Sequence, residues 1–208
     1  MSRKIILMIA AIAMGALLIG SYVVSKWGNE DALTACRRGV APGDMGGPFT
    51  LIDKDGRTVT DKDVITEPTL LYFGYTFCPD VCPFDVARNA DAVDVLAGRG
   101  YSATPIFISI DPERDTPQQV GEFASNMHER MIGLTGSPEQ IATASKAYRT
   151  YFRKQDSDDE YYLVDHSTFT YLVLPEQGFV DFFRREVTPE QMAERVACFI
   201  DATQEEGE

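Results

Sequence analysis

Basic residues are scarce in this sequence. Its 208 residues include 19 lysines and arginines against 32 aspartates and glutamates, which gives a formal net charge of −13. Binding to nucleic acid phosphates needs clustered lysine and arginine, so the composition excludes nucleic acid as a default partner. The acidic surface could serve docking to a basic partner or solubility alone. We expect the acidic run 156–160 to be an exposed loop and residues 204–208 to be a solvated acidic tail.

Long apolar runs are also scarce, with one exception at the N-terminus. Ile5 to Val24 is uncharged and mostly apolar, long enough at 1.5 Å per residue to cross a hydrocarbon core of about 30 Å. A cleaved signal peptide is the alternative, but its apolar region spans only about 7–15 residues, and Val23-Val24-Ser25 is a poor cleavage site. We therefore expect residues 1–25 to be an uncleaved anchor.

The charges beside this run predict its orientation. Arg3 and Lys4 precede it, so the N-terminus is expected in the cytoplasm and the rest of the chain is expected to be exported. The prediction is a single-pass inner-membrane protein whose soluble domain lies in the periplasm or an equivalent intermembrane compartment.

Histidine and cysteine are few, and their number limits the metal sites that the chain can form. There are two histidines and four cysteines. A structural zinc site usually takes four ligands from paired clusters, but only Cys78 and Cys82 form a close pair here. Cys36 and Cys198 lie outside this pair. In an exported chain they could bridge each other or remain free and buried, and the sequence does not decide between the two.

The spacing of Cys78 and Cys82 is the most informative feature of the chain. The pair follows an apolar strand-like run, 69–75, and precedes a helical pattern. Positions i and i+4 of a helical turn hold their Cβ atoms about 5–6 Å apart, whereas a relaxed disulfide needs about 3.8 Å. Two thiolates on one ion, with metal–sulfur bonds of about 2.3 Å, stand up to about 4.6 Å apart. The spacing therefore suits a shared metal at least as well as a disulfide.

His166 is the candidate for a third ligand, because it lies in Val164-Asp165-His166-Ser167 just ahead of another strand pattern. Two soft sulfurs with one imidazole nitrogen favour Cu(I) or zinc over magnesium or calcium, and three ligands fit copper better than zinc. Asp165 could orient the imidazole through a hydrogen bond. His128, near the end of an expected helix, is interpreted as a charge partner at the helix C-terminus or a solvated residue.

The periodicity elsewhere predicts alternating strands and helices. After a stalk or linker over residues 26–47, two short runs flank Asp55-Gly56, a hairpin turn signal. Strands are expected at 69–75, 105–110, 131–134, 169–174 and 179–184, and helices at 84–96, after 116 and at 188–202. Thr116, Ser137 and Thr188 each precede a Pro-x-Gln helix start.

This order is compatible with an α/β, thioredoxin-like fold over residues 48–203, with an N-terminal β-hairpin extension and a preceding transmembrane helix. In that fold the loop after the first central strand carries the cysteines, and the segment entering the C-terminal hairpin lies across from them. The topology thus brings Cys78, Cys82 and His166 to one edge of the sheet. The position of Cys78 and Cys82 at a helix N-terminus also favours thiolates, because the helix dipole lowers the pKa of a thiol there.

Two other groups near the cysteines are assigned structural roles. Asp111, Arg114 and Asp115 could form a functional charge cluster, but a loop-stabilising ion pair and turn is the preferred interpretation. The aromatic residues of 72–77 are interpreted as packing in the core and at its rim, with no chemistry assigned to them.

The run Tyr72-Phe73-Gly74-Tyr75-Thr76-Phe77-Cys78-Pro79-Asp80-Val81-Cys82-Pro83 resembles the signature of the Sco/SenC family of membrane-anchored copper proteins. Residues 109–117 and 164–167 resemble two further blocks of that family in the expected order. The resemblance extends from about Gly47 to Ile200 and includes the N-terminal anchor.

The resemblance implies a thioredoxin-like fold that binds copper through Cys78, Cys82 and His166. It also implies a role in building the dinuclear copper centre of cytochrome c oxidase subunit II, with another copper chaperone as a possible donor. Family members are implicated as copper donors, as thiol-disulfide reductases that keep the receiving cysteines reduced, or as both.

We favour a metallochaperone, and not an enzyme, as the function of this protein. It would pass copper to its recipient by ligand exchange. The alternative is a thiol-disulfide oxidoreductase, in which one thiolate attacks a partner disulfide and the other resolves the mixed disulfide. Thioredoxin-type reductases usually carry a proline before the strand opposite the cysteines, but Asp165-His166-Ser167 occupies that segment here. A peroxidase using Cys78 explains neither the pair nor the histidine, and a cysteine hydrolase would not need Cys82.

Overall fold

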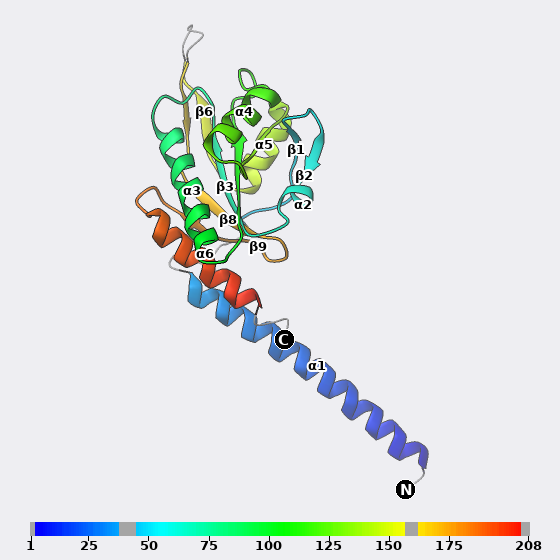
Figure 1. The fold of residues 1–208 in the computed structure, drawn as a ribbon. Helices are drawn as coiled ribbons and strands as arrows, with labels where there is room; N and C mark the ends of the chain where they lie inside the picture. The colour runs from blue at the N-terminus through cyan, green and yellow to red at the C-terminus, as the bar shows by residue number, and fades with distance from the viewer. Residues whose placement is uncertain (1–2, 38–44, 157–161, 205–208) are drawn as a thin grey trace.

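The structure is a computed structural model that describes residues 3–37, 45–156 and 162–204 (Figure 1). Most of the expected acidic loop and all but one residue of the expected tail lie outside the described residues. Within them, a seven-stranded sheet forms the centre of the molecule in the order β2-β1-β5-β4-β3-β8-β9. These strands are β1 Thr50–Asp53, β2 Thr58–Thr60, β3 Thr69–Gly74, β4 Thr104–Ser109, β5 Ile132–Thr135, β8 Thr170–Leu174 and β9 Gly178–Phe183.

The strand β3 is central, as its apolar sequence predicts. All six of its residues are buried. It pairs in parallel with β4 and antiparallel with β8, and β4 pairs in parallel with β5. Parallel strands with both faces covered are typical of α/β proteins. The carboxyl ends of β3, β4 and β5 therefore meet at one edge of the sheet, where the predicted cysteine loop begins.

Helices cover both faces of this sheet. They include α3 Val81–Gly98, α4 Pro117–Met127, α5 Pro138–Ala147 and α6 Pro189–Gln204; the chain also forms the short helix α2 Asp61–Val64 and the long helix α1 Arg3–Cys36, most of which extends away from the sheet (Figure 1). The three predicted helix starts are confirmed, because the hydroxyls of Thr116, Ser137 and Thr188 accept hydrogen bonds from the N–H groups of the third helical residues.

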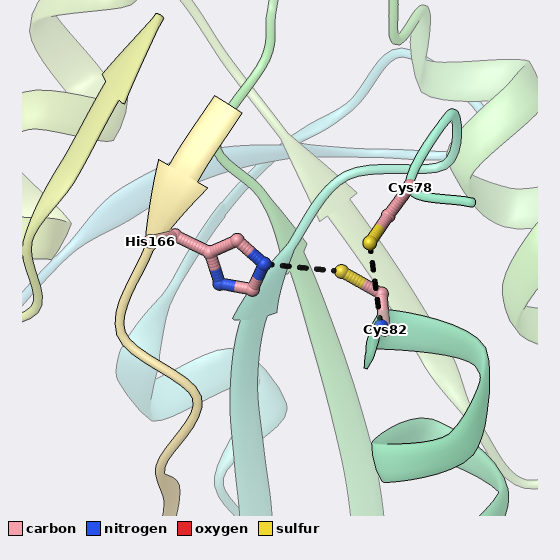
Figure 2. A group of neighbouring side chains, drawn as sticks. All are labelled: Cys78, Cys82 and His166. Carbon is pink, nitrogen blue, oxygen red and sulfur yellow. Dashed lines mark hydrogen bonds between the residues drawn. The ribbon is translucent and has the colours of Figure 1, made fainter. Parts of the chain in front are cut away.

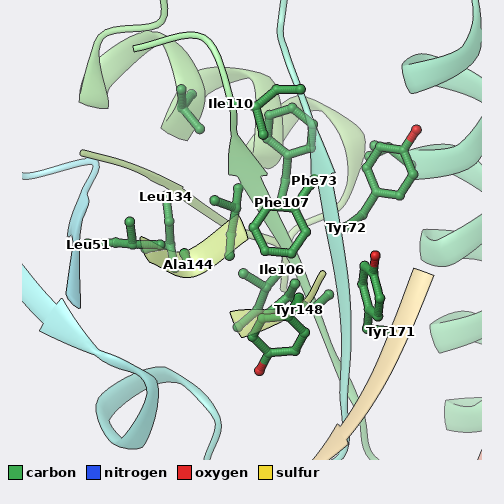
Figure 3. Packing of buried hydrophobic residues seen from close by; sticks show 14 of the residues in the cluster. Leu51, Tyr72, Phe73, Ile106, Phe107, Ile110, Leu134, Ala144, Tyr148 and Tyr171 are labelled. Carbon is green, nitrogen blue, oxygen red and sulfur yellow. The ribbon is translucent and has the colours of Figure 1, made fainter. Parts of the chain in front are cut away.

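Successive residues of β3 point to opposite faces of the sheet and pack against different helices (Figure 3). The Tyr72 ring stacks on Phe107, whose ring lies 4.7 Å from that of Phe123 in α4. The Phe73 ring faces the other way and contacts Tyr148, directly after α5, at 5.7 Å between centroids. Helices α3, α4 and α6 thus lie on one face and α5 on the other, so the site-bearing end of β3 is enclosed in a packed core.

Helix α1 differs from the sequence prediction at its C-terminal end. It continues through Cys36, so the first part of the expected linker is helical. Leu33 and Cys36, three positions apart, are buried against α6, which explains why the helix extends this far. Cys36 forms a disulfide with Cys198 of α6, which answers the question that the sequence left open. Within the described part of the chain, no helix reaches the length and apolar character needed to cross a membrane.

Helix α3 also begins earlier than predicted, at Val81 rather than after Pro83. A proline is tolerated in the first helical turn, because the N–H groups of that turn have no intrahelical acceptor. The earlier start places Cys82 inside the first turn. Its backbone is therefore fixed by the helix, whereas Cys78 lies in the preceding loop.

A second, two-stranded sheet was not predicted. It consists of β6 Phe152–Lys154 and β7 Val164–His166, paired antiparallel with Phe152 opposite His166. Each strand has three residues, and a polar segment separates them, so neither gives a clear strand pattern in the sequence. This ribbon carries His166 toward the edge of the main sheet.

Candidate metal centre

Cys78 and Cys82 are positioned by the connection between β3 and α3. The N–H of Cys78 donates to the carbonyl of Tyr75 at 3.2 Å, which closes a turn directly after the strand. The loop is also held by the segment that follows β4, because the Thr76 N–H donates to the Asp115 carboxylate at 2.9 Å. The cysteine loop is therefore held both by its own turn and by a carboxylate 39 residues further along the chain.

His166 reaches the same place from the opposite side, at the end of β7 (Figure 2). Its Nε2 lies 3.3 Å from the Cys82 sulfur, and the Cys82 N–H donates to the Cys78 sulfur at 3.4 Å. The three potential ligand atoms all lie within 4.8 Å of one another. The predicted convergence of Cys78, Cys82 and His166 is thus present, with both cysteines buried and the histidine half-buried.

The imidazole of His166 is oriented by a backbone carbonyl. Its Nδ1 lies 2.8 Å from the oxygen of Ser167, and because a carbonyl can only accept, Nδ1 carries the proton. Nε2 then has a free lone pair directed at Cys82, which is the form that binds a metal. The suggested role of Asp165 is wrong. Its carboxylate accepts from Gln155 at 2.6 Å, because neighbouring residues of a strand point to opposite sides.

The two thiols are electrostatically unequal. The Cys82 thiol donates a hydrogen bond to the Cys78 sulfur, and this is the largest cause that lowers the pKa of Cys78 despite partial burial. The pKa of Cys82 is raised, first because its proton is held by Cys78 and second because of burial. In the metal-free pair, Cys78 is the thiolate and Cys82 keeps the proton.

Gly74, the last residue of β3, leaves room for this arrangement. A Cβ at this position would lie 3.0 Å from the Cys82 sulfur and 2.9 Å from both the Tyr72 and Phe107 rings. Any larger residue would push these groups apart. The role of Gly74 could not be predicted from the sequence, since a glycine between two aromatic residues gives no signal until the groups packed against it are known.

The charged loop beyond β4 has the structural role that was predicted. Arg114 donates to Asp111 at 2.6 Å. Asp115 is almost fully buried and accepts from Ser109 at 2.5 Å as well as from the backbone and hydroxyl of Thr76. It therefore joins the end of β4 to the cysteine loop.

Two aromatic residues of the motif, Tyr72 and Tyr75, contact His166 in addition to packing in the core. The rings of Tyr72 and Tyr75 meet the His166 ring edge-on, with centroids 6.2 and 5.8 Å away. The Tyr72 hydroxyl donates to the buried carboxylate of Asp85 in α3 at 3.0 Å. Asp85 was not singled out in the sequence, because its partners lie in other elements, Tyr72 in β3 and Arg185 after β9. His128 lies at the C-terminal end of α4, as predicted, and its Nε2 lies 3.2 Å from the Asp94 carboxylate of α3.

The donor set fits a soft, thiophilic ion. It offers two sulfurs, one already a thiolate, and one unprotonated imidazole nitrogen in a largely buried setting. Soft thiolate ligands with an imidazole suit Cu(I) and zinc, and the count of three suits copper.

Comparison with known proteins assigns the family. The SCO1/SenC family model matches residues 38–201, and the chain belongs to this family. It is similar to protein SenC of Rhodobacter capsulatus, with 53% identity over 204 residues that cover 96% of this chain and 92% of SenC.

Solved structures agree with this assignment. Arabidopsis thaliana ScoI, solved with copper bound, is 44% identical and superposes with a TM-score of 0.72, covering 76% of this chain and 98% of that one. BsSco, a member of the Sco family of cytochrome c oxidase assembly proteins in which a disulfide switch was identified, is 25% identical with a TM-score of 0.61. The coverage is 79% of this chain and 96% of BsSco. The predicted thioredoxin-like α/β fold is thus the fold of the Sco proteins.

Proposed function

We propose that this protein is a membrane-anchored copper metallochaperone that binds copper through Cys78, Cys82 and His166. The observation that carries the proposal is the convergence of their three ligand atoms within 4.8 Å at one edge of the sheet. Cys78 is the preformed thiolate, His166 presents an unprotonated nitrogen, and Cys82 supplies the second sulfur after losing its proton. The copper-bound Arabidopsis relative supports the choice of metal.

Copper would be delivered to cytochrome c oxidase, at the dinuclear centre of subunit II. The assembly role of the Sco family supports the oxidase as the recipient. Ligand exchange requires direct contact between the two sites. The exposed rings of Phe77 and Phe84, on either side of the cysteines in sequence, are suited to such a contact. Another copper chaperone is expected to load the site.

The domain would be held at the inner membrane by residues 1–25, with the N-terminus in the cytoplasm and the copper site in the periplasm. The uncharged run from Ile5 to Val24 supports the anchor, together with exposed apolar side chains on this part of α1 such as Leu17, Leu18 and Ile19. Extraction at alkaline pH tests it. The full chain should stay with the membrane pellet, and release into the supernatant would contradict an integral anchor.

A thiol-disulfide reductase is the second candidate. It is favoured by the lowered pKa of Cys78 beside a protonated Cys82, which is the arrangement of an attacking and a resolving thiol. In this function the pair would reduce the receiving cysteines of the oxidase instead of, or before, donating copper.

Copper binding by the reduced full chain in detergent, under anaerobic conditions, tests the first proposal. One equivalent of Cu(I) is titrated against a competing chelator in the wild type and in Cys78→Ala, Cys82→Ala and His166→Ala. We expect stoichiometric binding that is lost in both cysteine variants and weakened about 10–100-fold in His166→Ala. His128→Ala is the matched control, because that histidine pairs with Asp94 and should bind copper like the wild type.

The same titration separates the two functions. Failure of the wild type to retain copper would overturn the chaperone proposal. If the Cys78–Cys82 pair then cycles readily with a model disulfide, the protein is a reductase. Retention of copper in either cysteine variant would show that the ligand set is wrong.

A further inference from the structure

Behind the metal ligands lies a buried polar group that the proposed function does not use. Asp85, three residues after Cys82 in α3, has a side chain only 4% exposed. Its carboxylate accepts from the Tyr72 hydroxyl at 3.0 Å and lies 3.3 Å from Arg185 and 3.9 Å from Arg88. A buried carboxylate is costly unless it is paired. The two arginines provide the ion-pair partners of the Asp85 carboxylate at this position.

Tyr72 links this carboxylate to the metal ligands. Its side chain is almost fully buried, and its ring meets the His166 ring edge-on. Tyr72 also lies beside Cys82, since a Cβ placed on Gly74 would lie 2.9 Å from the Tyr72 ring and 3.0 Å from the Cys82 sulfur. Burial is the largest cause that raises the pKa of Tyr72, and Cys82 and Asp85 each raise it further, so the Cys82 sulfur lies near the hydroxyl that donates to Asp85.

The Tyr72 hydroxyl has a single proton and two acceptors within reach. Hydrogen bonds to a charged acceptor are roughly twice as strong as neutral ones, and Asp85 is the partner to which the hydroxyl donates. A thiolate sulfur that accepts a hydrogen bond gives less electron density to a bound metal, which is one way in which proteins tune copper–thiolate sites. The direction of the hydroxyl therefore affects the Cys82 ligand.

We propose that Asp85 is a positioning residue that holds the Tyr72 hydroxyl away from the Cys82 sulfur, so that this pair sets the donor strength of one copper ligand. The inference rests on the proposed function, because it assumes that Cys82 binds copper. When Asp85 loses its charge, the hydroxyl turns to Cys82 and weakens the sulfur–copper bond.

Three variants test this as a cycle: Asp85→Asn, Tyr72→Phe and the double variant. The full chain in detergent is loaded with Cu(II), and the sulfur-to-copper absorption band is recorded. Affinity for Cu(I) is measured by chelator competition. We expect Asp85→Asn to move the band to shorter wavelength and to weaken binding about 10-fold. Tyr72→Phe should leave both near the wild type, since the hydroxyl already donates to Asp85.

The double variant decides between positioning and a general loss of charge. Without a hydroxyl nothing can turn toward Cys82, so the band and the affinity should return to those of Tyr72→Phe. If the shift of Asp85→Asn persists in the double variant, the effect comes from the lost charge or from packing, and the inference is overturned. An unchanged band in folded Asp85→Asn also overturns it. Should Asp85→Asn lose its near-ultraviolet circular dichroism, the apolar replacement Asp85→Leu takes its place with the same expectation.

These outcomes are distinguishable from failure of the proposed function. Stoichiometric Cu(I) binding by the wild type is measured first, and its absence overturns both proposals. Binding with an unperturbed Asp85→Asn site overturns only the role of Asp85.

Discussion

At the scale of single residues, Cys78 and Cys82 lie in different environments although only four positions separate them in the sequence. Cys78 lies in a loop, where it accepts hydrogen bonds from the N–H and the thiol of Cys82. Cys82 lies in the first turn of α3 and is completely buried. In either proposed function, Cys78 would therefore be the sulfur that meets an incoming metal or disulfide first, and Cys82 would complete the bond.

This asymmetry predicts the pH dependence of alkylation. The thiolate is the reactive form, and the pKa of Cys78 is lowered, so iodoacetamide should modify Cys78 rapidly at pH values where an ordinary thiol, with a pKa of about 8.5, is inert. Mass spectrometry of the reduced metal-free protein gives the rate at each site. In Cys82→Ala the midpoint should rise, because the largest cause of the lowered pKa is removed. A wild-type midpoint near that of a free thiol would contradict this assignment.

Gly74 gives a second prediction at this scale. Gly74→Ala places a methyl group 3.0 Å from the Cys82 sulfur, so the unfolding free energy should fall by about 1–3 kcal/mol, and copper binding should weaken. Chemical denaturation followed by circular dichroism measures the first effect. Gly98→Ala, at the far end of α3, is the matched control, since nothing lies within 4 Å of its new Cβ. Equal stability of the two variants would show that the space beside Gly74 is not required.

At the scale of the elements, the site depends on a joint between β4 and the cysteine loop. Asp115 makes that joint by accepting hydrogen bonds from Thr76 and Ser109. Asp115→Ala leaves these donors without an acceptor, so we expect a loss of about 2–3 kcal/mol of stability and weaker copper binding. Asp53 is a matched control far from the cysteines, because it accepts from the N–H groups of Asp55 and Arg57 in the β1–β2 turn. Asp53→Ala should lose stability without losing copper affinity, and the same affinity loss in both variants would contradict a local role for Asp115.

Elements with a strong local pattern could be predicted from the sequence. The buried run that became β3, and the hydroxyl–proline starts of α4, α5 and α6, owe their structure to nearby residues. The site followed from these, because the topology fixes which strand ends meet. The β6–β7 ribbon could not be predicted, since strands of three residues gain their stability from pairing rather than from their own sequence.

Features that depend on contacts with other elements also could not be predicted from the sequence. The helical extension of α1 to Cys36 is stabilised by burial against α6, which lies at the other end of the chain. The carbonyl of Ser167, not the carboxylate of Asp165, orients His166, because the direction of a side chain depends on strand register. Asp85 acquires its role from Tyr72 and Arg185.

On the scale of the whole molecule, a disulfide cross-links α1 to α6 of the domain. The Cys36–Cys198 disulfide closes a sequence separation of 162 residues, and Arg37 adds a hydrogen bond to the Val180 carbonyl at 3.1 Å. Helix α1 and the end of α6 thus share one packed cluster. The disulfide lies in the packed cluster that contains Leu96, near the C-terminal end of α3, whereas Cys82 lies in the first turn of α3, so stability and copper affinity should be separable.

Removal of the disulfide tests that separation. In Cys36→Ser/Cys198→Ser the unfolding free energy should fall by about 2–5 kcal/mol, because the unfolded chain regains entropy. Copper affinity should remain that of the wild type. Denaturant titration and chelator competition measure the two quantities. Dithiothreitol should lower the stability of the wild type to that of the double variant and leave the variant unchanged. A parallel loss of copper affinity would mean that the two ends of α3 are coupled.

The link between α1 and α6 also limits where delivery can take place. If the run from Ile5 to Val24 lies in the bilayer, the helix from Val24 to Cys36 rises about 18 Å, and α3 from Leu96 back to Cys82 adds at most about 21 Å. Because the Cys36–Cys198 disulfide ties the end of α1 to α6, the proposed metal ligands would then lie no more than about 40 Å from the lipid surface and would move laterally with the anchor. The search for a recipient then becomes two-dimensional, and a protein is reached only if its receiving site stands within that height.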